Sequence, residues 1–136
     1  MQNTNIAGSF KKILLSAFLL SLLVACAEMV PMSPTNYYPC ENPSARQIEL
    51  TETVTFMLST QYSRTLRKGS TWQEVGKLPQ GLVYRPVKSV FTLEGRQVHE
   101  AYLVISGKKL VGFYLPVESS FSPIVEPIIL PLGDAL

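Results

Sequence analysis

The sequence is poor in the residues that most catalytic and metal sites use. It contains one histidine, His99, and two cysteines among 136 residues. No second histidine follows the His99-Glu100 pair at the spacing that a zinc-hydrolase helix requires. A Gly-x-Ser-x-Gly elbow and a phosphate-binding glycine loop are also missing. We therefore expect a protein that is not an enzyme, with no catalytic residue, metal site or cofactor, and we expect His99 to be a partly buried, hydrogen-bonded structural residue.

Without its first 25 residues, the chain also has no excess of either positive or negative charge. The whole chain has 12 basic and 10 acidic residues. Lys11 and Lys12 lie in the first 25 residues, which hold no acidic residue, so ten basic and ten acidic residues remain in the other 111. Nucleic-acid binding depends on clustered Lys and Arg, so no nucleic-acid partner is expected. About 110 residues leave room for one small domain.

Residues 1–25 have the parts of a secretory signal peptide that is removed from the mature protein. Lys11-Lys12 forms a cationic start, and residues 13–24 form an almost unbroken apolar run that leads to Ala25. This run is too short for a stable transmembrane helix, which needs about 20 residues.

The tetrapeptide Leu23-Val24-Ala25-Cys26 resembles the lipobox of bacterial lipoproteins. The resemblance implies cleavage between Ala25 and Cys26, and attachment of acyl chains such as palmitate to Cys26. Two or three acyl chains anchor a protein firmly, since each buried methylene contributes about 0.8 kcal/mol. The residue after the cysteine is Ala27 rather than Asp. By the same resemblance we expect the protein at the outer membrane, on its periplasmic face or at the cell surface.

Lipidation of Cys26 would leave Cys40 without an intrachain partner. A lone thiol in an oxidising compartment pairs with another chain, which would give a dimer through Cys40, or is modified, or is simply buried or tolerated. The sequence leaves these outcomes open.

Residues 26–47 have no hydrophobic period and contain four prolines. This composition favours an extended, semi-rigid tether between the acylated cysteine and a domain that begins at Ile48. Tyr37-Tyr38 either contacts a partner or folds back onto the domain, and the sequence does not distinguish the two.

Residues 48–66 alternate between apolar and polar side chains, which is typical of a half-buried strand. A helix is the competing prediction because four apolar residues also lie four positions apart, namely Val54, Leu58, Tyr62 and Leu66. Threonine is abundant in this stretch and loses side-chain freedom in a helix, so a strand is favoured. So long a strand has to bend or to break near Ser59-Thr60.

After Gly69, turn residues recur at short intervals, as in an antiparallel meander that forms a barrel or a sandwich. The expected strands are residues 72–78, 82–87, 90–93, 96–105 and 110–115. The pair 101–105 and 110–115 is apolar on both faces, so one face packs on the core and another segment must cover the other. We expect one all-β domain over residues 48–136.

The extended, Pro-rich C-terminal tail over residues 116–136 is a candidate for that cover. Its prolines preclude a regular helix, yet it is strongly apolar. It either wraps over the sheet or docks on a partner. The residues that would dock are Ile124, Ile128, Ile129, Leu130 and Leu132.

These observations predict a membrane-anchored lipoprotein that serves as a structural or interaction module in a cell-envelope assembly. The alternative is a surface or periplasmic lipoprotein that binds a ligand or inhibits an enzyme, with a pocket lined by residues such as Trp72, Tyr84, Tyr102 and Tyr114. The basic cluster Arg64, Arg67 and Lys68 beside a turn is a further candidate contact, for lipid head groups or an acidic partner.

Overall fold

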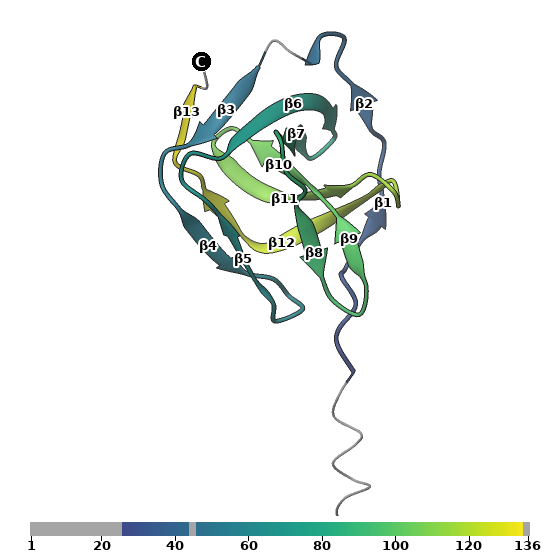
Figure 1. Ribbon diagram of the computed structural model, residues 1–136. Coiled ribbons are helices and arrows are strands. Elements are labelled where there is room, and N and C mark those ends of the chain that lie inside the picture. Colours follow the sequence, from purple (N-terminus) through teal and green to yellow (C-terminus); the bar gives the residue numbers. More distant parts are fainter. Residues whose placement is uncertain (1–25, 44–45, 135–136) are drawn as a thin grey trace, which may run out of the picture.

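The computed structural model describes residues 26–43 and 46–134, which form thirteen β-strands and no α-helix (Figure 1). The expected signal peptide, with its cleavage residue Ala25, lies outside the described residues. The strands are β1 (Ser33–Pro34), β2 (Tyr38–Pro39), β3 (Gln47–Leu50), β4 (Val54–Met57), β5 (Ser63–Leu66), β6 (Thr71–Leu78), β7 (Gly81–Pro86), β8 (Thr92–Glu94), β9 (Val98–Glu100), β10 (Tyr102–Ser106), β11 (Lys109–Leu115), β12 (Ser120–Ile129) and β13 (Leu132–Asp134).

One antiparallel sheet of nine strands forms most of the domain. Its order is β1-β12-β11-β10-β7-β6-β3-β13, and β2 also pairs with β6. In the chain only Leu130 and Pro131 separate β12 from β13, although these strands lie near opposite ends of the order. The sheet therefore curls so that the end of β12 comes close to β13, which gives the barrel-like form in Figure 1. The predicted all-β, antiparallel fold is confirmed.

Short turns set the order of the central strands, as the sequence predicts. The β6–β7 hairpin turns at Pro79-Gln80, and the β10–β11 hairpin turns at Gly107-Lys108. Gly107 has a φ of +64°, which suits a two-residue loop with glycine in its first central position.

The stretch over residues 48–66 forms strands and breaks near Ser59-Thr60 as predicted, but it also breaks at residues 51–53, which the sequence did not indicate. It forms β3, which belongs to the main sheet, and a separate two-stranded hairpin of β4 and β5. The expected strand over residues 96–105 is also divided, because β9 pairs with β8 outside the main sheet. The division falls at Ala101, a fully buried residue whose amide donates to the carbonyl of Phe91.

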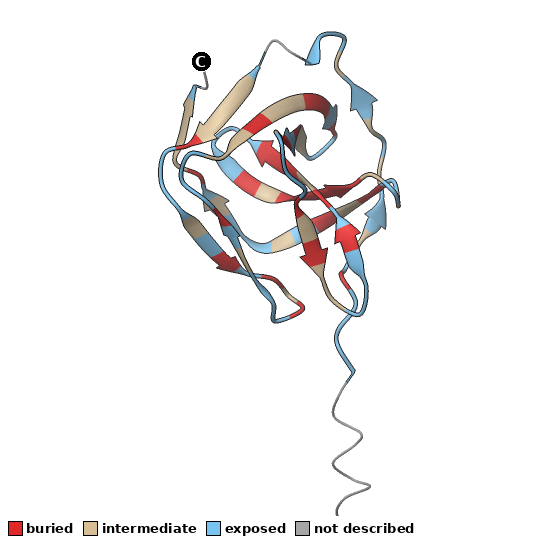
Figure 2. Ribbon diagram, viewed as in Figure 1, coloured by how far each residue is buried: buried red, intermediate tan, exposed pale blue. Residues whose placement is uncertain are grey.

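The larger core lies inside the curl, where the β4–β5 and β8–β9 hairpins close over the sheet (Figure 2). Phe113 on β11 stands between Phe56 and Phe91, with ring centroids 5.9 and 5.8 Å away. Trp72 meets Phe91 edge-on at 5.7 Å. Aromatic contacts of this kind add to the free energy gained by burying the rings.

The outer face of the sheet carries a second buried cluster, which includes Val83, Val104 and Tyr114. It is covered in part by Tyr37, whose ring stacks on Tyr114 at 4.8 Å and whose hydroxyl donates to the carbonyl of Val75 over 2.7 Å. Part of the cover for this face therefore comes from the N-terminal side. It is supplied by Tyr37 of the Tyr37-Tyr38 pair, while Tyr38 stays exposed.

Residues 28–40 belong to the β domain and do not form the expected tether. Val30 is buried in the core, β1 pairs with β12, and β2 pairs with β6. The amide of Arg96 donates to the carbonyl of Glu28 over 2.9 Å. Prolines are tolerated in these two short strands because both lie at the margin of the sheet.

The C-terminal tail forms two strands of the sheet, β12 and β13, rather than a loose cover. β12 pairs with β11 over most of its length, with a bulge in which residues 124–127 stand opposite Val111 alone. Pro127 lies in that bulge, where its missing amide hydrogen costs no ladder hydrogen bond.

Candidate functional site

A groove with a volume of about 470 Å³ lies between β5 and the segment that precedes β8. We call it the arginine groove. It is lined by residues 63–67, Ser70, Trp72 and residues 89–91. Its floor is aromatic and its walls carry hydroxyl and guanidinium groups, a mixture that suits a ligand with both apolar and anionic parts.

Arg64 lies against the aromatic floor of this groove. Its Cζ lies 4.7 Å from the centroid of the Phe91 ring, and its Nη1 lies 3.5 Å from Oε1 of Glu94. Arg64 Nε is buried and has no hydrogen-bond partner among the described residues. A buried donor left without a partner is costly. Because protein atoms cover this nitrogen, a ligand in the groove would contact the exposed 23 % of the Arg64 side chain instead.

Arg67 stands at the mouth of the groove on the turn after β5. Its side chain is exposed and pairs with no acidic side chain in the described part of the chain. Lys68, the third member of the predicted basic cluster, is exposed beside it but does not line the groove. The structure thus brings two of these three cations to one groove.

A second groove, with a volume of about 350 Å³, contains the only histidine of the chain. His99 is buried and its Nδ1 lies 2.5 Å from Oε1 of Glu118, a hydrogen bond that orients the ring. The remaining lining residues include Met29, Met32 and Arg96, and none offers a hydroxyl or thiol nucleophile. The expectation that His99 is a hydrogen-bonded structural residue is consistent with this geometry.

Glu118 was missed in the sequence, since it lies 19 positions from His99 and no spacing rule connects the two. The stacking of Arg64 on Phe91 was also missed, because no spacing rule connects those two residues. The described residues contain no group of three or more His, Cys, Asp or Glu side chains placed to hold a metal ion.

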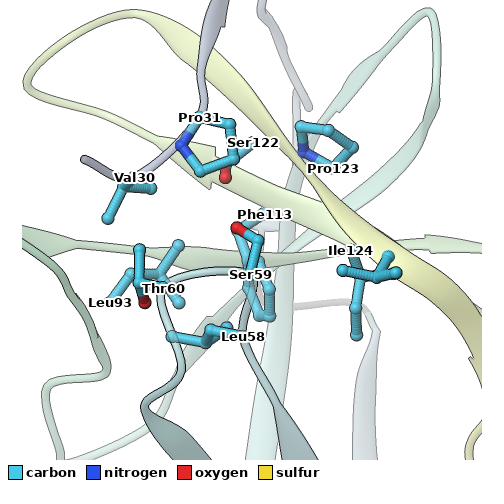
Figure 3. Close-up of a pocket in the computed structure, with 11 residues that line it drawn as sticks. Val30, Pro31, Leu58, Ser59, Thr60, Leu93, Phe113, Ser122, Pro123 and Ile124 are labelled. Carbon is cyan, nitrogen blue, oxygen red and sulfur yellow. The ribbon is translucent and has the colours of Figure 1, made fainter. Parts of the chain in front are cut away.

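The interior of the barrel offers no room for a ligand at the point where three segments meet. The pocket in Figure 3 has a volume of about 10 Å³, enough for about one water molecule. Val30, Leu58 and Ile124 reach into it from the N-terminal segment, the β4–β5 turn and β12 (Figure 3). The point where these three segments meet is therefore part of the packed core.

The four aromatic residues expected to line one pocket do not come together. Trp72 and Tyr84 belong to the inner core, while Tyr114 is buried in the outer cluster with Tyr102 packed against it. Of the four, Trp72 alone lines the arginine groove.

The predicted docking residues of the tail have unequal surroundings. Leu130 is 2 % exposed and is part of the core, so it is not accessible to a partner in this conformation. Ile124, Ile128 and Leu132 are half-buried against the same core. Ile129 is 69 % exposed and remains accessible on the tail.

Both cysteines are free thiols in the structure, and Cys26 is exposed. Cys40 is half-buried, and its Sγ donates weakly to the carbonyl of Glu74 over 3.5 Å. A covalent dimer through Cys40 stays a prediction. Within residues 26–43 and 46–134, no helix has the length and apolarity needed to cross a bilayer.

Comparison with known proteins adds no relative from which a function could be transferred. No protein-family model matches the chain, and no curated protein sequence or solved structure matches it either.

Proposed function

We propose that this protein is a membrane-anchored bacterial lipoprotein whose small β domain acts as a non-enzymatic interaction module in a cell-envelope assembly. The lipobox-like tetrapeptide ending at Cys26 motivates the anchor. A rigid binding surface held at a membrane gains partner affinity from two signals, the lipid and the protein contact.

The observation that carries the proposal is how closely the domain follows the anchor. The chain is held by the domain from Glu28 onward, through the hydrogen bond from the amide of Arg96. Two residues of extended chain span at most about 7 Å. Acyl chains on Cys26 would therefore keep the β domain against the membrane surface, where it meets only partners in or beside that membrane.

The surface around Glu28 suits a position at the membrane. Met29 is 66 % exposed, and Arg96, which lines the same groove, is exposed on the turn between β8 and β9. An exposed apolar side chain beside a cation matches the interface of an anionic bilayer. By resemblance to the lipoprotein class, the outer membrane is the proposed location.

Chemical crosslinking in native cells, followed by purification of the protein and identification of its partners, tests this proposal. Recovery of one envelope complex in stoichiometric amounts, and its loss in Cys26→Ala, is the expected result. The control must still fold, and Cys26 is exposed and outside both core clusters. Recovery of the protein alone from wild type and Cys26→Ala would reject the assembly role.

A further inference from the structure

Strand β5 has one edge that no other strand covers. It pairs with β4 and with no other strand of the described residues. In an antiparallel pair, every second residue directs its backbone N–H and C=O groups away from its partner strand. Such an edge is a template for an added strand.

The arginine groove follows this edge. Five consecutive residues, 63–67, line it, and no residue of β4 does, so the groove lies on the side of β5 that faces away from β4. At about 3.3 Å per residue, five extended residues span about 17 Å. Residues 89–91 line the other side of the groove.

The positive charge of the groove favours an acidic extended segment over a neutral or basic one. Arg64 and Arg67 both line it, and no acidic residue does. Glu94 engages the Arg64 guanidinium only at 3.5 Å, and 23 % of the Arg64 side chain stays exposed. A ligand carboxylate would pair with this exposed part of Arg64 and with the exposed Arg67.

We propose that the arginine groove binds an extended, acidic peptide segment of a partner protein, which adds as a strand to the free edge of β5. Arg64 and Arg67 pair with its carboxylates. A peptide supplies backbone donors and acceptors in the periodic line that the edge requires, which a lipid head group does not. The groove also shares no lining residue with the second groove, which adjoins the proposed membrane-facing surface at Met29 and Arg96. The inference rests on the proposed interaction role and names the chemistry of the partner.

Trp72 provides the assay because it is the only tryptophan of the chain and lines the groove. Its Nε1 donates to the hydroxyl of Ser70, another lining residue, over 3.1 Å. The full-length protein in detergent micelles is titrated with an acetylated pentapeptide that alternates valine with aspartate or glutamate. A saturable change in tryptophan fluorescence is expected, and the amide counterpart with asparagine and glutamine should bind about tenfold more weakly or worse.

Three variants separate charge recognition from loss of fold. Arg67→Gln should weaken binding of the acidic peptide about threefold, the effect of one exposed ion pair. Arg64→Gln should weaken it about tenfold, since the Arg64 side chain is only 23 % exposed and solvent screens its ion pair less than that of Arg67. Lys109→Gln removes an exposed charge from the β10–β11 hairpin, away from the groove, and should leave the affinity unchanged. If Arg64→Gln does not fold, Arg67→Gln against Lys109→Gln still decides the role of charge.

Equal affinity for the acidic and amide peptides would overturn the inference, and so would equal affinity of Arg67→Gln and Lys109→Gln. An acidic peptide methylated at alternate backbone nitrogens should lose binding, and its retention would refute strand addition. Arg67-dependent binding to vesicles of anionic lipid, without peptide binding, would assign the groove to the membrane instead. The titration does not require the lipid anchor, so a failed titration with an intact crosslinked complex rejects this inference and leaves the proposed function standing.

Discussion

Replacing Tyr37 with alanine should remove much of what holds residues 28–40 on the sheet. The ring stacks on Tyr114 with an interplanar angle of 9°, and its hydroxyl bonds to the carbonyl of Val75. Gly76 leaves the space for this ring, since a Cβ there would lie 2.5 Å from Cε2 of Tyr37. The backbone and the ring are thus fitted closely to each other.

The expected loss in the free energy of unfolding follows from these contacts. Truncation of a fully buried aromatic residue costs about 3–5 kcal/mol, and Tyr37 is half-buried, so about 3 kcal/mol is expected for Tyr37→Ala. Tyr37→Phe keeps the stacked ring and loses the hydrogen bond, for about 1 kcal/mol. Tyr38→Ala is the matched control. Its side chain is 52 % exposed, and its cost should stay within about 0.5 kcal/mol.

Urea unfolding followed by Trp72 fluorescence measures all three variants. The chain from residue 26 onward with Cys26→Ser can be made without acyl chains. For a domain of this size, the Tyr37→Ala variant should also melt roughly 10–20 °C lower. If Tyr37→Ala costs no more than Tyr38→Ala, the N-terminal segment is not part of the folded unit, and the argument that the domain is held close to the membrane fails with it.

Two further predictions concern the tail and the tyrosines. Leu130→Ala should lower the free energy of unfolding in urea by about 2–5 kcal/mol, because the Leu130 side chain is buried. Ile129→Ala should lower it by less than about 0.5 kcal/mol, because the Ile129 side chain is exposed. Equal losses for the two variants would contradict the placement of the tail. Burial raises the pKa of Tyr37, Tyr84 and Tyr102 above the ordinary value of 10.0. The unfolded chain therefore releases these protons first, so the free energy of unfolding should be fully retained below pH 10.0 and decline as pH rises through the folded pKa values. Urea titrations on either side of that pH measure the decline, which Tyr37→Phe should make shallower; a stability that does not change with alkaline pH would contradict the burial of these phenols.

Much of the β structure could be predicted because its signals are local. Alternation and threonine content indicate extended chain over residues 48–66, and Pro79 and Gly107 mark two hairpin turns that the structure contains. The interruption at Ala101 could not be predicted in this way. Residues 96–105 are uniformly compatible with a strand, and only the burial of Ala101 against Phe91 divides them between two sheets.

The sequence predicted single residues of the candidate site but not the groove that they line. The basic cluster at residues 64, 67 and 68 was visible in the sequence, but not the groove, because Phe91 and residues 89–90 approach from a distant segment. Proline content suggested a tether over residues 26–47, since prolines disfavour regular structure. Here extended chain with prolines forms short marginal strands, which require few ladder hydrogen bonds.

By itself, the sequence determined that this domain is all-β and where most of its strands turn, because side-chain alternation and turn residues act over a few positions. It also determined that the Ala101–Leu115 region needs a cover on each face. Tertiary structure alone decided which segments supply the outer cover, with Tyr37 among them, and which cations share a groove. Those outcomes depend on contacts between residues more than 20 positions apart, such as Tyr37 with Val75 and Arg64 with Phe91. Local patterns carry no information about such contacts.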